Sequence, residues 1–167
     1  MMNKKLIAIL FLMAPLAIFA QKFGHLNSAD IMQAMPEYKT AQTELQNLEK
    51  QYTNELQMME SELAKKSDAY EKEKATLPAN IAQRREAELQ DLYGRMQQYY
   101  QESQQQLAQA SQEKMNVLVE KITKAIKEVG VAGGYLYIFD TSSGIPYISE
   151  TLSTDVTAAV KTKLGIQ

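Results

Sequence analysis

The chain has 167 residues and a formal charge of −2, and 45% of its residues are hydrophobic. It contains no cysteine, which excludes disulfides and thiolate metal sites. The acidic balance argues against non-specific nucleic-acid binding, which depends on a basic surface. The length suits a single domain. Much of the apolar content lies in the first 20 positions and in one long amphipathic stretch, so we expect an elongated or oligomeric protein.

Residues 1–20 have the pattern of an export signal. Lys4 and Lys5 precede an uncharged apolar run from Leu6 to Ala20, which is shorter than the ~20 residues of a membrane span. We expect cleavage before Gln21 and a periplasmic mature chain with 16 basic and 20 acidic residues. An uncleaved leader that anchors the chain in the membrane is the alternative.

Residues 21–36 predict a short strand followed by a short helix. Lys22–Leu26 has strand character, and Asn27 or Ser28 is a suitable N-cap for the helix. Pro36 interrupts this helix and fits the first position of the next one.

Residues 37–129 predict a coiled-coil helical hairpin. Apolar residues recur three and four apart on both sides of Pro78, and the region otherwise contains one helix breaker, Gly94. A turn is therefore expected near residues 76–80. Facing residues of such a hairpin have numbers that sum to about 156, which places Met59 opposite Met96. The seam would contain Ala41, Leu45, Leu48, Tyr52, Leu56, Met59, Leu63 and Tyr70 on the outgoing helix, and Leu89, Leu92, Met96, Tyr99, Leu107, Ala110, Leu118, Ile122 and Ile126 on the returning helix.

The predicted seam is interrupted by polar residues. Tyr52 would face the segment 103–105, and eight of the sixteen residues from Gln97 to Gln112 are glutamine. We expect a loosely zipped arm that can bend and splay. Tyr99 and Tyr100 are about 100° apart around the helix, so they cannot both point into the seam and one of them should be presented outward.

Residues 130–167 predict the remainder of a small β-rich body. Gly130, Gly133 and Gly134 should end the arm. We expect strands at Tyr135–Phe139 and Ile145–Ile148, then a final helix capped by Ser153 or Thr154 with Asp155 in its first turn. A hairpin begins and ends at one place, so the strands from the two ends of the chain should meet.

The expected fold is α+β and mostly α: a long antiparallel helical hairpin on a small β-rich oligomerisation body made of residues 21–36 and 130–167. Three strands cannot enclose a core alone, and association of several chains would cover their edges. The residues expected to carry this association are Phe23, Leu26, Leu136, Ile138, Ile145 and Ile148.

The sequence resembles the OmpH family of periplasmic chaperones, also called Skp, over essentially the whole mature chain. The N-terminal match is Asn27–Ile31 followed by Pro36–Lys39, and the C-terminal match is Tyr135–Asp140, then Ile145–Tyr147 and Thr154–Thr157. The resemblance implies a homotrimer whose helical tentacles enclose unfolded outer-membrane proteins and prevent their aggregation. It implies no ATP and no other cofactor.

On this resemblance the arm is the client-binding element. The candidate client-binding residues are Met58, Met59, Leu63, Tyr70, Leu77, Leu92, Tyr93, Met96, Tyr99 and Tyr100. Charges in the outer arm are balanced, with six basic residues between Lys65 and Arg85 against six acidic residues between Glu62 and Glu88. This balance does not support membrane or lipopolysaccharide contact by the arm. The alternative function is an exported or membrane-tethered structural coiled-coil scaffold. Such a scaffold has no evident use for the strands and the helix expected within residues 130–167.

Nothing in the sequence predicts an enzyme. The single histidine, His25, lies in a predicted strand, and the carboxylates are spread along solvated helices. The sequence has no phosphate-binding loop, nucleophile elbow or metal-ligand spacing. Asp140 and Asp155 are explained by turn and helix-start positions.

Overall fold

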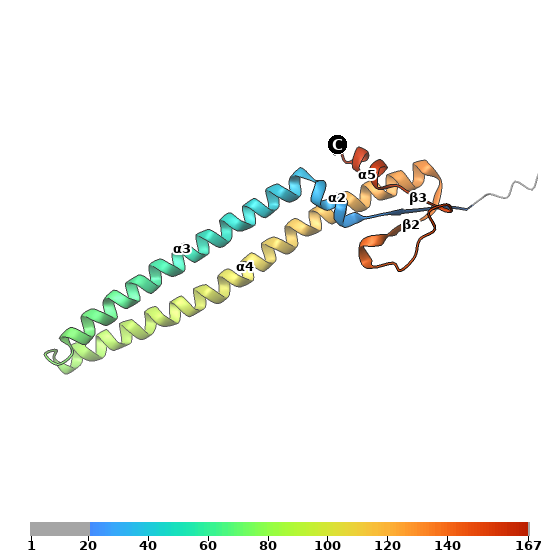
Figure 1. Ribbon diagram of the computed structural model, residues 1–167. Coiled ribbons are helices and arrows are strands. Elements are labelled where there is room, and N and C mark those ends of the chain that lie inside the picture. The colour runs from blue at the N-terminus through green and yellow to red at the C-terminus, as the bar shows by residue number, and fades with distance from the viewer. Residues whose placement is uncertain (1–20, 167) are drawn as a thin grey trace, which may run out of the picture.

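The computed structural model describes residues 21–166, so the leader expected at residues 1–20 lies outside the described residues. Figure 1 shows a two-helix arm that projects from a small body of strands and short helices, which confirms the predicted fold class. In chain order the elements are β1 (Lys22–Leu26), α2 (Ser28–Ala34), α3 (Pro36–Glu73), α4 (Ala79–Gly133), β2 (Tyr135–Asp140), the 3₁₀ turn η1 (Thr141–Ser143), β3 (Ser153–Asp155) and α5 (Thr157–Lys163).

The two arm helices begin and end at residues suited to those positions. Pro36 occupies the start of α3, where its missing N–H is not needed. At the other end, Gly134 caps α4 with a φ of 64°, a conformation that glycine adopts without steric cost. Gly130 does not end the helix as expected: it lies inside α4, and the helix continues for three further residues. With 55 residues, α4 is about 80 Å long at 1.5 Å per residue.

The chain reverses between Glu73 and Ala79, with Pro78 at the N-cap of α4. The contact between Tyr70 and Glu86 has the predicted sum of about 156, and the contact between Glu37 and Lys121 near the body lies two residues from that register. The sequence-based register is therefore confirmed to within two residues along the arm.

The body contains a parallel three-stranded sheet in the order β2-β1-β3. Gly24 pairs with Ile138 of β2 and with Thr154 of β3, which confirms that the two ends of the chain meet. The strand expected at Ile145–Ile148 is wrong. That segment has no regular structure, and Pro146 within it has no N–H to offer a ladder. The third strand is instead Ser153–Asp155.

The start of the last helix also differs from the prediction. Ser153 and Thr154 belong to β3, and Val156 is the N-cap of α5 without a side-chain hydrogen bond. Asp155 stands just before the helix, and its carboxylate accepts a hydrogen bond from the backbone N–H of Thr157 at 2.8 Å.

Polar contacts fix the start of α2 against the end of β2. Asn27 is the N-cap, and its side-chain oxygen accepts hydrogen bonds from Ala29 N and Asp30 N at 3.1 and 3.2 Å. Asp140 accepts a hydrogen bond from Ser28 N at 3.1 Å and another from Ser142 N at 3.0 Å. Burial opposes ionisation of Asp140, but the hydrogen bonds from the two serines outweigh it and lower its pKa.

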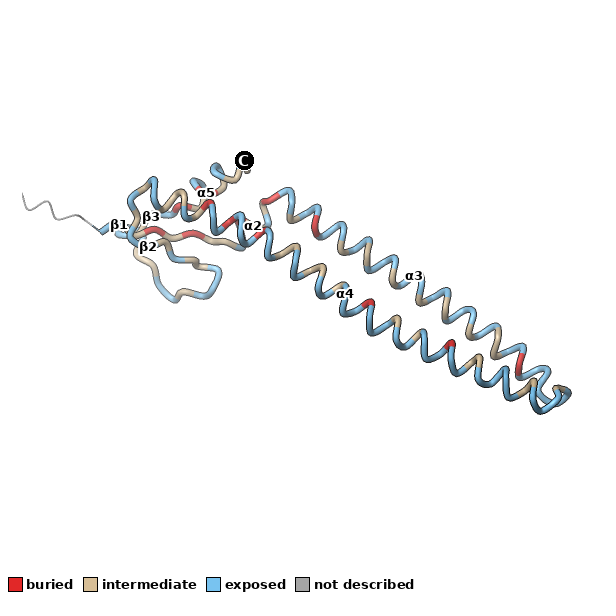
Figure 2. Tube along the Cα trace, turned by 180° about the vertical axis from the view of Figure 1, so that it is seen from behind, coloured by how far each residue is buried: buried red, intermediate tan, exposed pale blue. Residues whose placement is uncertain are grey.

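The hydrophobic core lies between one face of the sheet and the helices. Its buried members come from β1, α2, α4 and the α5 region: Leu26, Ile31, Met35, Leu118, Ile122, Ala125, Val156 and Val160. Figure 2 shows buried residues gathered in the body and at the base of the arm, with few farther out. The arm helices therefore obtain much of their stability at one end.

We expect the Ile31→Ala substitution to lower the free energy of unfolding by about 2–5 kcal/mol, because Ile31 is fully buried and its loss leaves a cavity. Urea denaturation followed by circular dichroism measures the change. The matched control is Val119→Ala, since Val119 is 49% exposed on α4. Equal losses in the two variants would contradict the assigned core.

Candidate functional site

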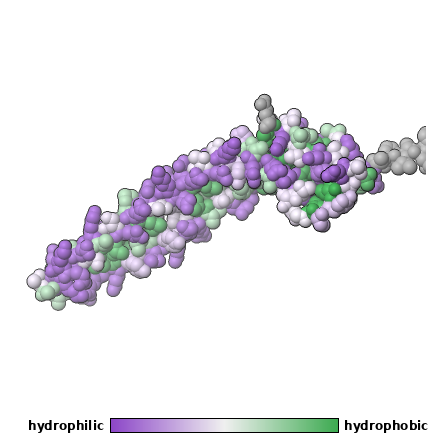
Figure 3. All heavy atoms as spheres, in the orientation of Figure 1, coloured by the Kyte–Doolittle hydropathy of each residue, from purple (hydrophilic) through white to green (hydrophobic). Residues whose placement is uncertain are grey.

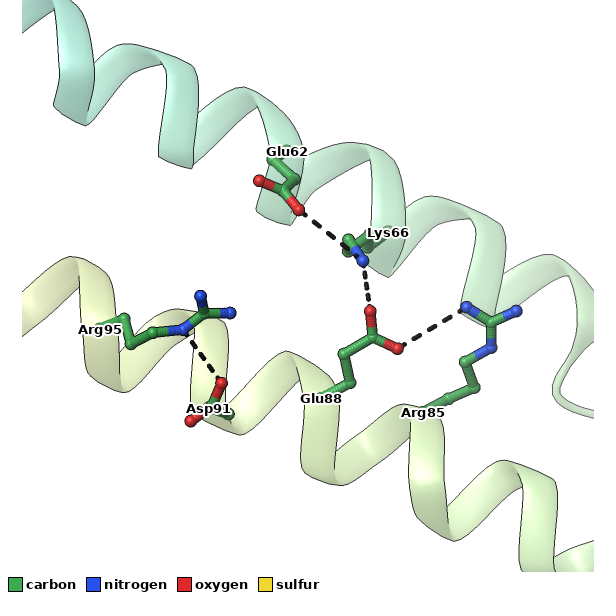
Figure 4. A network of polar contacts seen from close by, with 6 residues as sticks. All are labelled: Glu62, Lys66, Arg85, Glu88, Asp91 and Arg95. Carbon is green, nitrogen blue, oxygen red and sulfur yellow. Dashed lines mark hydrogen bonds and ion pairs between the residues drawn. The ribbon is translucent and has the colours of Figure 1, made fainter.

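The distal end of the arm is closed by a polar network between the helices (Figure 4). Lys66 of α3 forms ion pairs with Glu62 on its own helix and with Glu88 on α4, and Arg85 approaches the other oxygen of Glu88 at 3.8 Å. The Lys66 ammonium donates a hydrogen bond to Glu88 and thereby lowers the pKa of that carboxyl group. These groups are solvent-exposed, so the network fixes register more than it contributes free energy.

Tyr70 reinforces the same end of the arm. Its side chain is 5% exposed, and its hydroxyl donates a hydrogen bond to Glu86. The carboxylate holds the phenol in its neutral form and raises the pKa of Tyr70 to about 12.

Two further ion pairs join the helices near the body. Lys114 contacts Glu44, and Lys121 lies 3.1 Å from Glu37. Between these two residues of α4, Leu118 is buried against the core. The arm is therefore held at its base by apolar packing and by charge.

The middle of the arm is held less firmly. Within residues 21–166, no ion pair joins the two helices between the Glu44–Lys114 and Lys66–Glu88 pairs. Tyr52 fills the predicted polar gap: its hydroxyl donates to Gln106 at 2.7 Å, and its ring meets the Tyr99 ring edge-on at 6.2 Å. Ser103 is buried in the seam, where its hydroxyl donates to the Tyr100 carbonyl.

The candidate client-binding residues separate into three groups. Met58, Tyr93 and Tyr100 point outward and are 59%, 53% and 51% exposed, whereas Tyr70 and Leu92 are buried between the helices. The half-buried members along the seam and at the tip are Met59, Leu63, Leu77, Met96 and Tyr99. Of the adjacent pair Tyr99 and Tyr100, one therefore faces the seam and the other faces outward, as the sequence predicts.

The face of the sheet opposite the helices carries apolar side chains with little cover. Phe23 stacks on Tyr137, and Tyr137 is followed on the same face by Phe139. Tyr137 and Phe139 are 58% and 46% exposed. Beside them the loop before β3 presents Tyr147 and Leu152, which are 79% and 77% exposed. An isolated chain thus exposes a large apolar surface, which is typical of an association site.

Some candidate oligomerisation residues lie on this face and others do not. Phe23, Ile145 and Ile148 line a groove of about 260 Å³ on it. Leu136 is 51% exposed but does not line this groove. Leu26 is fully buried in the core of its own chain, and Ile138 packs against that same core. The expectation that Leu26 and Ile138 carry the association is therefore wrong. Successive residues of a strand face opposite sides of the sheet, and these two face the core. Sequence reasoning missed Tyr137, Phe139, Tyr147 and Leu152, although the alternation within Tyr135–Asp140 contains the signal for the first two.

The described residues include no candidate metal-binding cluster. Residues 21–166 contain no group of three or more His, Asp or Glu side chains that could hold a metal ion. The imidazole Nδ1 of His25 lies 2.8 Å from the Ser153 hydroxyl, a contact that fixes neighbouring strands. Of the helices from α2 to α5, none combines the length and apolar character that a membrane span requires.

The geometry defines a class of protein with a long two-helix arm on a small body whose sheet exposes an apolar face. The chain belongs to the OmpH family, because the family model described as "Outer membrane protein (OmpH-like)" matches residues 22–164. This match confirms the resemblance read from the sequence.

Curated relatives and a solved structure agree with this assignment. The chain is 28% identical to the chaperone protein Skp of Yersinia enterocolitica over 154 residues, which cover 91% of this chain and 93% of that protein. It is also 28% identical to the chaperone protein Skp of Vibrio cholerae over 153 residues, which cover 90% and 89% of the two chains. The crystal structure of an OmpH-like protein from Caulobacter crescentus shares the fold, with a TM-score of 0.76, 18% identity, and coverage of 86% of this chain and 83% of that one.

The Tyr70–Glu86 contact predicts a distinct pH dependence. A raised pKa means that the neutral phenol stabilises the arm fully below pH 10 and that this contribution is lost as the pH rises through about 12. We expect tyrosinate absorbance to show a component near pH 12 that the Tyr70→Phe substitution removes. Glu86→Gln is the control and should move this component toward the ordinary pKa of 10.0. A titration curve left unchanged by both substitutions would refute the contact.

Proposed function

We propose that this protein is an ATP-independent periplasmic holdase chaperone that binds unfolded outer-membrane proteins and prevents their aggregation. The observation that carries the proposal is the arm itself, which extends far beyond the body and presents methionine and tyrosine side chains to solvent. Membership of the OmpH family and the two relatives named as chaperones support it. Export by the N-terminal leader is part of the proposal.

The geometry suits a client without a fixed shape. An unfolded chain exposes many apolar residues at variable positions, so it is better held by many weak contacts than by one pocket. Met58, Tyr93 and Tyr100 provide flexible and amphipathic contacts of this kind. Because each contact is weak, the client can leave without an energy source once its own folding competes with binding.

Self-association completes the proposed chaperone. The apolar face around Phe23, Tyr137 and Phe139 needs cover, and a further copy of this chain could supply it. We propose a homotrimer, so that three arms project from one assembled body and surround a client. The balanced charge of the outer arm, where Lys66 and Arg85 are engaged with Glu88, gives no support for docking to an anionic membrane.

We expect the purified protein to suppress the aggregation of an outer-membrane β-barrel diluted out of urea, in the absence of nucleotide. Turbidity of the diluted barrel measures the effect, and an equal mass of an unrelated soluble protein is the control. Unchanged aggregation at a molar excess of this protein would refute the holdase function.

We expect Phe139→Asp to dissociate the oligomer, because the assembly would bury an unpaired charge on the sheet face. Light scattering should give a trimer mass for the unsubstituted protein and a smaller mass for the variant, with the helical circular dichroism retained. Val119→Asp is the matched control, since Val119 is 49% exposed but lies on α4, away from this face. A variant that stays trimeric would contradict the proposed interface.

A further inference from the structure

The two sides of the arm differ in charge. In the distal half, one side of α4 carries an ion-paired network in which Glu88 is paired with Lys66 and Arg85, and Asp91 lies 3.0 Å from Arg95 (Figure 4). Glu86 lies on the side of Tyr93, where it accepts the hydrogen bond from Tyr70. At 100° per residue, Asp91 and Arg95 lie about 160° around the helix from Tyr93. The exposed tyrosine of this segment therefore points away from the charged side.

The opposite side presents a nearly uncharged groove. Thr53, Gln57 and Glu60 of α3 face Gln97, Tyr100 and Gln104 of α4 across a groove of about 530 Å³. The side chains of Leu56 and Met96 also line it. Figure 3 shows an interrupted line of apolar surface along the arm between hydrophilic margins.

Tyr93 extends this groove toward the tip. The side-chain amide of Gln97 donates a hydrogen bond to the Tyr93 hydroxyl at 3.1 Å. Tyr93 and Tyr100 are seven residues apart, which places them on the same side of α4, about 10 Å from each other along the axis. Both are more than half exposed. From Tyr93 to Gln104 the surface is about 16 Å long, the length of roughly five residues of an extended chain.

We propose that this tyrosine–glutamine face, defined by Gln57, Tyr93, Gln97, Tyr100 and Gln104, is the client-binding surface of the arm and takes extended, uncharged segments of unfolded polypeptide. The inference rests on the proposed holdase function and assigns its binding site to one side of the arm. The opposite, ion-paired side binds no client.

The chemistry of the face matches that occupant. An extended segment has backbone N–H and C=O groups without partners, and a glutamine amide can both donate to and accept from such groups. Tyrosine rings provide large apolar contact with few rotatable bonds to immobilise. Glu60 is the charged residue among those that line the groove, so charged client segments gain little there, whereas uncharged segments lose no ionic solvation.

The first test compares the exposed tyrosines of the face with an exposed apolar side chain elsewhere on α4. Fluorescence binding of a urea-unfolded outer-membrane β-barrel polypeptide should give a Kd about tenfold weaker for Tyr93→Ser/Tyr100→Ser than for the unsubstituted protein. Val119→Ser is the control, because Val119 is 49% exposed on α4 and lies outside the face. It should change the Kd less than about twofold. An unchanged Kd in the tyrosine variant, or an equal loss in the Val119 variant, would overturn the assignment.

The second test uses matched charge insertions on α4. Gln97→Glu/Gln104→Glu places two carboxylates on the face and should weaken binding severalfold. Gln101→Glu/Gln105→Glu makes the same chemical change about 80–120° away around the helix from Tyr93 and should leave the Kd within about twofold. Equal effects of the two pairs would overturn the assignment.

Failure of the holdase function and failure of the face assignment give different results. If the unsubstituted protein does not bind the unfolded polypeptide at all, the holdase function itself is wrong and the face assignment falls with it. If the unsubstituted protein binds and the control variants lose as much affinity as the variants of the face, the function stands and the assignment is refuted. Light scattering and circular dichroism must show the same oligomer and helix content for every variant.

Discussion

Parallel hydrogen bonding between β1 and β2 joins two segments that are separated in the chain by the whole arm. This pairing brings the start of α3 and the end of α4 to one place, so two long helices that share a thin seam are forced to remain neighbours. The same strands supply one side of the core and expose Phe23, Tyr137 and Phe139 on the other. Closure of the hairpin and the exposed apolar face of the sheet therefore depend on one set of backbone contacts.

Contacts at both ends of the arm hold its two helices together. Near the body the seam is closed by buried apolar residues and by the Glu37–Lys121 pair, and near the tip by Tyr70 and the Lys66–Glu88 pair. Exposed ion pairs contribute little free energy singly, but they oppose sliding of one helix along the other. The segment between them has no ion pair across the helices among the described residues, and it presents the groove in which Glu60 is the charged lining residue.

Structural elements with a strong local pattern could be predicted from the sequence. Elements with a weak pattern, or that depend on register, could not. The helical period and Pro78 located the hairpin, and Asn27 and Pro36 marked helix starts that the structure confirms. Ser153–Asp155 is short and polar, so it resembles a helix cap more than a strand, whereas the apolar segment Ile145–Ile148 resembles a strand and is not one. The helical period placed Met59 and Tyr99 in the seam, and their neighbours Met58 and Tyr100 point outward in the structure.

Hydrogen exchange can show whether the arm is fixed at both ends and more loosely held between them. Exchange of backbone amides measures the free energy of local opening along each helix. We expect faster exchange in segments 48–63 and 93–108 than in segment 115–126 at the base and at the residues around Tyr70 and Glu86. Uniform protection along the arm, or a middle better protected than the base, would contradict it.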